Sequence, residues 1–133
     1  KTRVLEQRMF ERRAKDMAEA ETIYRKSKQR FFDLEFCEDN IVIKPLVTVQ
    51  QFRDIGKSHN LCLFSNEYFR KKRSLVFAAT INGQIIEVID VCLAAFYVKE
   101  NLGAGNKPTK HNKLIRDVMS KNMYQIEKRL KAA

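Results

Sequence analysis

The chain has 133 residues, 44% of them hydrophobic, and its 26 Lys and Arg outnumber its 16 Asp and Glu to give a formal net charge of +10. This length fits one domain, and nine Phe with four Tyr supply bulk for a core. No apolar run approaches the roughly 18 residues that a membrane span needs, so we expect no membrane contact. The sequence does not begin with Met, and we expect a longer chain with a further N-terminal region as a partner of this part.

Three cysteines, Cys37, Cys62 and Cys92, are widely spaced and form neither a CxxC motif nor a Cys/His cluster. This spacing argues against a structural zinc site, and we expect no metal site and no cofactor. Buried, reduced thiols are typical of cytoplasmic proteins, so we expect a cytoplasmic location.

Residues 2–32 contain no Gly or Pro and place apolar residues at three- and four-residue steps, which predicts one long helix. The apolar content is thin for this length, so we expect about half of the helix to project from the body. We interpret residues 1–31 as a basic helix that acts as a connector or as the contact of a homodimer. Residues 32–133 then form a single α+β domain.

The domain begins with a predicted small hairpin, residues 32–44, whose strands flank Glu38 and Asp39. Thr48 can cap a short helix over residues 49–55, and Gly56 suits the left-handed position just past its end.

The strongest local signal lies between residues 74 and 99. Asn82-Gly83 joins two apolar runs, and this pair is typical of the two-residue turn of a β-hairpin. A third strand follows at about residues 95–99. Strict alternation along the second strand places Ile85 on the face of Glu87 and puts Ile86 on the opposite face.

Residues 101–112 hold two of the four glycines and predict a loop, with Thr109 as the cap of a final helix that ends near Lys131. The apolar stripe of this helix should pack across the sheet. The predicted fold class is α+β: an antiparallel meander of about residues 74–99, with the small hairpin 32–44, packed against the C-terminal helix. We expect the helices on one side of the sheet.

The positive charge concentrates near both ends of the chain and in one uninterrupted internal run, which favours a polyanion such as DNA or RNA. The alternative is a solvated surface, or contact with an acidic region of a longer chain. The residues predicted to contact nucleic acid are Arg70, Lys71, Lys72, Arg73, Lys110 and Lys113.

A second hypothesis is an enzyme with a polar pocket between residues 56–68 and 103–111. Its candidate catalytic residues are Cys62, His111 and Asn106, because a Cys–His pair can make a thiolate nucleophile. The alternative is a packed cysteine beside an exposed histidine. Glu87, Asp90 and Glu100 could bind a metal ion or move protons, and we interpret them instead as solvent-facing strand residues.

The order of segments from Ile41 to Arg129 resembles the PcfJ-like family of conjugative plasmids and other mobile elements. The resemblance is carried by Ile41-Val42-Ile43, the segment Phe52 to Cys62, Glu67-Tyr68-Phe69 with the basic run, Ser74-Leu75-Val76, Ile86-Glu87-Val88-Ile89, Leu93, Phe96, Asn106, His111 and Asn122-Met123 with Ile126. It implies a setting on mobile elements and a longer N-terminal part, and it implies no settled activity.

The chain departs from similar members at two places. They tend to have His-His-Cys where this chain has Asn60-Leu61-Cys62, and Gln-x-Arg-Gly where it has Glu100-Asn101-Leu102-Gly103. A catalytic pocket would therefore be altered or degenerate here. Three hypotheses remain: a nucleic-acid-binding domain, a hydrolase or nuclease-like enzyme, and a helix-mediated assembly module.

Overall fold

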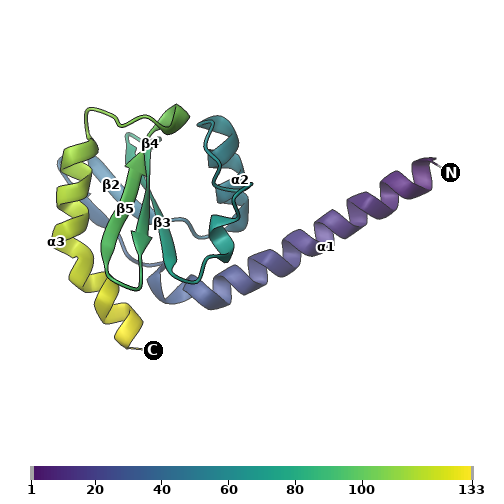
Figure 1. Ribbon diagram of the computed structural model, residues 1–133, viewed down its shortest axis with the longest axis horizontal. Helices are drawn as coiled ribbons and strands as arrows, with labels where there is room; N and C mark the ends of the chain where they lie inside the picture. Colours follow the sequence, from purple (N-terminus) through teal and green to yellow (C-terminus); the bar gives the residue numbers. More distant parts are fainter. Residues whose placement is uncertain (1, 133) are drawn as a thin grey trace.

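The computed structural model describes residues 2–132 (Figure 1). In chain order its elements are α1 (Thr2–Lys28), the 3-10 turn η1 (Gln29–Phe31), β1 (Phe36–Glu38), β2 (Ile41–Pro45), α2 (Val49–Ser58), η2 (Tyr68–Arg70), β3 (Ser74–Ile81), β4 (Gln84–Cys92), β5 (Tyr97–Leu102), η3 (Ala104–Asn106) and α3 (Asn112–Lys131).

The five strands form one antiparallel sheet in the order β1-β2-β3-β4-β5, so each strand pairs with its neighbour in the chain. Asn82 and Gly83 both have positive φ, 52° and 79°, as a two-residue turn between twisted strands requires. The predicted α+β fold, meander and small hairpin are confirmed. The third strand is shifted along the chain: β5 runs from Tyr97 to Leu102, so it begins later than predicted and extends into the predicted loop.

Helices cover both faces of the sheet, so the expectation that they lie on one side is wrong (Figure 1). On one face, α3 buries Ile115, Met119 and Ile126 against Phe77 and Ile89. On the other face, the end of α1 and α2 form a second core, in which Val76, Ala78 and Val88 of the sheet meet Ala20, Tyr24, Val49 and Phe52. Both faces of β3 and β4 are apolar, and each face therefore needs its own cover.

A β-bulge lies near the start of β4, where Thr80 pairs with Ile85 and Ala79 pairs with Glu87, which leaves Ile86 without a partner. As a result Ile86 packs with the α3 core and Ile85 packs with the α2 core. The strict alternation predicted from the sequence places both residues on the wrong faces.

Helix α2 begins as predicted, with a capping box in which Thr48 accepts from the Gln51 amide. Its end differs from the prediction. The helix continues to Ser58, so Gly56 is a buried helical residue rather than a left-handed cap. A Cβ at Gly56 would lie 3.0 Å from the Leu61 carbonyl oxygen, because the following loop folds back closely on the helix.

The first half of α1 projects away from the domain (Figure 1). Its large apolar side chains Val4, Leu5, Met9 and Phe10 are exposed, and Phe10 reaches 73%. The second half is anchored by Ala20 and Tyr24, and the Tyr24 hydroxyl donates a hydrogen bond to the Leu46 carbonyl oxygen at 2.5 Å. Burial of this hydroxyl raises the pKa of Tyr24.

Candidate functional site

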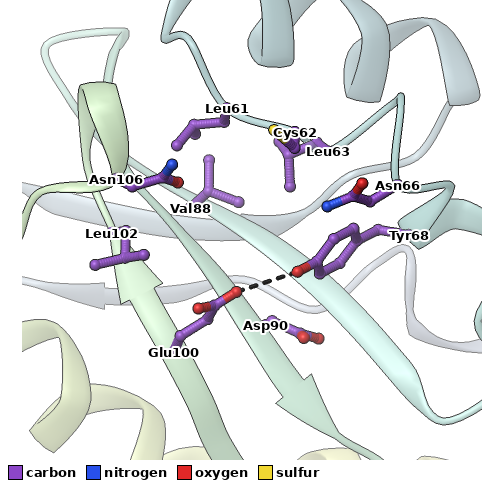
Figure 2. A pocket seen from close by; sticks show the side chains of 10 residues that line it. All are labelled: Leu61, Cys62, Leu63, Asn66, Tyr68, Val88, Asp90, Glu100, Leu102 and Asn106. Atoms are coloured by element: carbon purple, nitrogen blue, oxygen red, sulfur yellow. Dashed lines mark hydrogen bonds between the residues drawn. The ribbon is translucent and has the colours of Figure 1, made fainter.

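A pocket of about 370 Å³ opens on the α2 side of the sheet (Figure 2). One wall is the irregular chain after α2, its floor is formed by β4 and β5, and η3 closes one end. The lining residues are Leu61, Cys62, Leu63, Asn66, Tyr68, Val88, Asp90, Glu100, Leu102 and Asn106. The pocket therefore lies where segments 56–68 and 103–111 approach each other. These are the two segments between which the enzyme hypothesis expected a pocket.

His59 links these two segments at the edge of the pocket. The Gly105 amide donates to the His59 carbonyl oxygen at 2.8 Å, which ties η3 to the end of α2. The His59 ring also reaches the sheet, where its Nε2 lies 3.1 Å from the Ile85 carbonyl oxygen and its Nδ1 lies 2.7 Å from the Ser58 hydroxyl. His59 holds the walls together rather than facing the pocket.

Asp90 is the most deeply buried charged residue of the pocket, with 7% of its surface exposed. Its Oδ1 and the Ser74 hydroxyl are buried, and neither has a well-formed hydrogen bond with any residue that the structure describes. Burial raises the pKa of Asp90, against the opposing effects of the facing Ser74 hydroxyl and of Lys99 and Lys71, while Glu100 adds to the rise. The expectation that this side chain faces solvent is wrong.

Glu100 is the direct cross-strand partner of Asp90 on β5, so both carboxylates reach the same face of the sheet. The Tyr68 hydroxyl donates a hydrogen bond of 3.2 Å to Glu100 Oε1 (Figure 2). Burial and the nearby Glu100 raise the pKa of Tyr68. The Lys71 ammonium lies 3.8 Å from the centroid of the Tyr68 ring.

The structure brings together two of the three predicted catalytic residues. Cys62 and Asn106 both line the pocket, whereas His111 does not line it and occupies the turn before α3, the helix that covers the other face. Cys62 and Cys37 are exposed and Cys92 is buried, so the expectation of buried thiols holds for Cys92 alone.

Glu87, the strand acid among the residues that carry the family resemblance, lies on the other face of the sheet and is fully buried. Its carboxylate accepts hydrogen bonds from Asn101 Nδ2 at 2.9 Å, from the Thr109 amide at 2.9 Å and from the Thr109 hydroxyl. Asn112 Nδ2 lies 3.3 Å from it, and Arg116 binds Asn101 Oδ1 at 2.8 Å. These contacts fasten the chain before α3 to the sheet.

Two expectations change with this network. Glu87 does not face solvent. Thr109 does not cap α3, because the helix begins at Asn112 and the Thr109 hydroxyl is committed to Glu87. The Glu87 carboxylate is surrounded by hydrogen-bond donors from β5 and from the loop, and these bonds position the loop 103–111.

A buried lysine fixes the internal basic run. Lys28, at the end of α1, is 2% exposed, and its ammonium donates to the carbonyl oxygens of Lys71 at 3.2 Å, Lys72 at 3.0 Å and Ser74 at 2.7 Å. The three donors of the ammonium are thereby all used. The side chains of residues 70–73 remain exposed, so the backbone of the run is held while its charges face outward.

The last turn of α3 reaches the same end of the domain. Arg129 donates to the Arg30 carbonyl oxygen at 3.1 Å and pairs with Asp33. Three basic segments that are far apart in sequence therefore meet at one end of the sheet (Figure 1). We call this surface the basic end; its residues are Arg25, Lys26, Arg30, Arg70, Lys71, Lys72, Arg73, Lys128, Arg129 and Lys131.

Lys110 and Lys113 lie elsewhere. They follow Leu102, which pairs with Val88 toward the Asn82-Gly83 turn, whereas the basic run precedes Ser74, which pairs with Cys92 at the other end of the sheet. An eight-residue strand spans about 26 Å. The six predicted nucleic-acid contacts are thus split between opposite ends of the domain.

The sequence missed the pairing of Asp90 with Glu100, the part of Tyr68 in the pocket and the buried position of Lys28. The only signal for the pair was the spacing of the two acids across a short predicted turn.

Among residues 2–132, no group of three His, Cys, Asp or Glu side chains is arranged to hold a metal ion. No helix of this part of the chain is long and apolar enough to cross a membrane.

The fold is a five-stranded antiparallel meander covered by helices on both faces, with a polar pocket on one face and a basic end. The model of the PcfJ-like protein family matches residues 7–115, so the chain belongs to this family. The match includes most of α1 as well as the sheet. No curated protein and no solved structure matches the chain.

Proposed function

We propose that this PcfJ-like domain binds nucleic acid through the basic end. The observation that carries the proposal is the convergence of the ends of α1 and α3 on the run Arg70–Arg73, joined by the bonds of Lys28 and Arg129. Neutralising phosphates with clustered Lys and Arg releases counterions, which drives this kind of binding.

The acids at this end leave most of the positive charge free. Glu67 pairs with Arg70 at 3.2 Å, Glu127 pairs with Lys131 at 3.1 Å, and Asp33 pairs with Arg129. Lys71, Lys72 and Arg73 take part in none of the ion pairs between the described residues. These three side chains are the phosphate contacts that we expect to matter most.

A groove of about 500 Å³ adjoins this surface and shares Arg70 with it. Arg13 of α1 and Arg53 of α2 also line the groove, together with the rings of Phe64 and Phe69 and the acids Asp16 and Glu67. Arginines beside aromatic rings are typical of sites for unpaired nucleotides. A preference for single-stranded DNA or RNA would place a base in this groove, and a preference for duplex would leave the groove outside the contact.

The test is fluorescence anisotropy with labelled duplex DNA, single-stranded DNA and RNA between about 50 and 200 mM salt. The triple variant Lys71→Gln, Lys72→Gln, Arg73→Gln removes three charges without touching the carbonyl oxygens that Lys28 binds. It should weaken binding more than tenfold and lower the salt slope by roughly 0.9 per lost contact on duplex DNA.

The matched control is the double variant Lys110→Gln, Lys113→Gln, which removes two charges at the opposite end of the sheet. It should bind within a few-fold of wild type. If the control loses as much affinity per charge as the triple variant, binding is not localised at the basic end. Binding that is unchanged over this salt range would refute the proposal as a whole.

The setting is part of the same proposal. We infer from the family resemblance that the chain belongs to a protein of a conjugative plasmid or another mobile element, where contact with nucleic acid is expected. A cytoplasmic location agrees with this setting and with three cysteines that form no disulfide.

Helix-mediated assembly is a second candidate, favoured by the exposed side chains of Val4, Leu5, Met9 and Phe10 on the projecting half of α1. We propose that this half pairs with a second copy. Sedimentation equilibrium over a range of concentrations should show a dimer that the double variant Leu5→Glu, Met9→Glu abolishes and the control Gln7→Glu retains. A strictly monomeric mass at all concentrations would exclude this contact.

A further inference from the structure

The pocket on the α2 side has a charge opposite to that of the rest of the chain. The chain carries a net charge of +10, yet the charged residues that line the pocket are the carboxylates Asp90 and Glu100. Neither takes part in the ion pairs between described residues. Lys71 and Lys99 lie close enough to influence Asp90, but both are exposed and neither lines the pocket.

The buried carboxylate is incompletely satisfied. Asp90 is 7% exposed, and its buried Oδ1 has no well-formed hydrogen bond: the Ser74 hydroxyl faces this carboxylate and is itself buried without a well-formed bond. An unsatisfied buried acceptor destabilises a fold unless something donates to it. Lys28 lies near Asp90, but the three bonds of its ammonium go to main-chain carbonyl oxygens instead. Because a carboxylate accepts through two oxygens, Asp90 has acceptor capacity beyond the facing Ser74 hydroxyl for a group that enters the pocket.

The other lining residues suit a cation with an aliphatic stem. Leu61, Leu63 and Leu102 supply apolar walls, and Tyr68 contributes an aromatic ring. Asn66 and Asn106 add side-chain carbonyl oxygens that can accept from N–H groups. Figure 2 shows Asp90 and the Glu100–Tyr68 pair together on one side of the pocket, with the leucines distributed around it.

We propose that this pocket binds an organic cation, an alkylammonium or guanidinium group, whose N–H groups donate to Asp90 and Glu100 while its stem lies against the leucines. Charge-assisted hydrogen bonds to carboxylates are the strong kind. The site differs in chemistry from the proposed nucleic-acid surface, because two carboxylates would repel phosphate, and it borders that surface at Lys71, whose ammonium lies against the Tyr68 ring. Such a cationic group can come from two kinds of molecule: a free amine, or an Arg or Lys side chain of another protein.

The test uses butylguanidinium and its neutral counterpart butylurea, titrated into the full chain by NMR with the side-chain amides of Asn66 and Asn106 as reporters. A ligand of this size binds with a Kd on the order of millimolar. The cation should bind at least about tenfold more tightly than the urea, because the carboxylates then accept charge-assisted bonds. Equal affinities, or no shift of these amides with the cation, would overturn the proposal.

Three variants localise the effect. Asp90→Asn and Glu100→Gln keep the shape of each side chain and remove its charge, and each should weaken butylguanidinium binding by about tenfold. The control Glu19→Gln removes an exposed acid of α1 and should leave the affinity unchanged. Thermal unfolding of each variant confirms that the fold is intact. Wild-type affinity in both pocket variants would place the cation elsewhere.

Proton release gives a readout that a purely structural role would not change. A bound cation favours the charged form of Asp90, whose pKa is raised by burial in the free protein, so binding at a pH close to this raised pKa should release protons. Calorimetry in two buffers with different ionisation enthalpies measures this release, and Asp90→Asn should abolish it. Glu100, Lys28, Lys71, Lys99 and Ser74 are the neighbouring polar groups, and Glu100→Gln should reduce the release without abolishing it.

The two sources are separated by two further probes. Spermidine stands for a free amine, and N-acetyl-arginine methylamide stands for a side chain of a partner. Tighter binding of spermidine would identify a free amine as the ligand, and tighter binding of the arginine derivative would identify a protein side chain. Failure of all the cations would overturn the pocket proposal, and the salt-dependent binding of nucleic acid would stand or fall separately.

Discussion

Replacing Lys28 with Met tests whether this buried ammonium holds the basic run. The variant keeps most of the aliphatic volume and removes three hydrogen bonds of 2.7 to 3.2 Å. All three carbonyl oxygens lose this donor, but that of Lys71 still accepts from the Ser74 amide. The cost therefore falls on the carbonyl oxygens of Lys72 and Ser74. Each unsatisfied buried acceptor costs about 1–3 kcal/mol. Relief of the buried charge offsets part of this cost, and we expect a net loss of about 2–4 kcal/mol at pH 7.

The pH dependence gives a second, independent measurement. Burial lowers the pKa of Lys28 to about 8, with Asp90 opposing the shift. Between this value and the ordinary 10.5 the unfolded chain binds a proton that the folded chain does not, so stability rises with pH. Wild type should gain about 2 kcal/mol from this group between about pH 7 and 9.5, and Lys28→Met should not. This pH range ends below the pH at which Tyr24 titrates. The raised pKa of Tyr24 makes stability fall as the pH rises, which is opposite to the effect of Lys28.

Urea unfolding followed by circular dichroism at several pH values measures both effects. The control is Lys26→Met, an exposed lysine two residues earlier on α1, which should change the free energy of unfolding by less than about 0.5 kcal/mol. If Lys28→Met is as stable as wild type at pH 7, the three hydrogen bonds do not stabilise the fold. If the variant keeps the wild-type pH slope, Lys28 is not the group that titrates.

Three further variants are measured in the same way. Asp90→Asn should be at least as stable as wild type at pH 7. The pKa of Asp90 is raised in the folded state, so wild type loses stability as the pH rises above the ordinary value of 3.8. A variant less stable than wild type would contradict this prediction. Glu87→Gln turns an amide NH2 group toward hydrogen-bond donors and should lower the free energy of unfolding by about 2–4 kcal/mol. An unchanged stability would show that the hydrogen bonds with Thr109 and Asn101 do not stabilise the fold. Gly103→Ala places a Cβ 2.6 Å from Thr109 Cγ2 and should cost about 1–3 kcal/mol, and wild-type stability would show that the loop yields freely.

The sequence by itself determined the elements whose signals are local. Asn82-Gly83 fixes the central hairpin because both residues accept positive φ. The apolar stripe of α3 follows from periodicity, because this face of the helix is buried against the sheet. The long helix α1 follows from a run of residues without Gly or Pro. The family could be identified from residues spread along the chain, and the match over residues 7–115 confirms it.

Only the tertiary structure decided which charged residues are buried. Glu87 and Asp90 are three residues apart on one strand, so alternation alone places them on opposite faces. The structure decides that Glu87 is satisfied by Asn101 and Thr109 on the α3 face, whereas Asp90 is left incompletely paired on the α2 face. The bulge at Ile86 likewise depends on pairing with β3. Partners that lie 14 to 22 residues away in sequence leave no periodic signal.

The candidate sites follow the same division. The basic run at Arg70–Arg73 was visible in the sequence as a block of charge, but Lys28, which fixes it, lies more than 40 residues earlier in the chain. The sequence could assign Cys62 and Asn106 to one pocket, because the segments that hold them flank the predicted sheet. It could not assign Asp90 and Glu100, the carboxylates on the floor of this pocket. Their burial depends on packing between the loop after α2 and the two strands, a long-range contact that only the folded chain establishes.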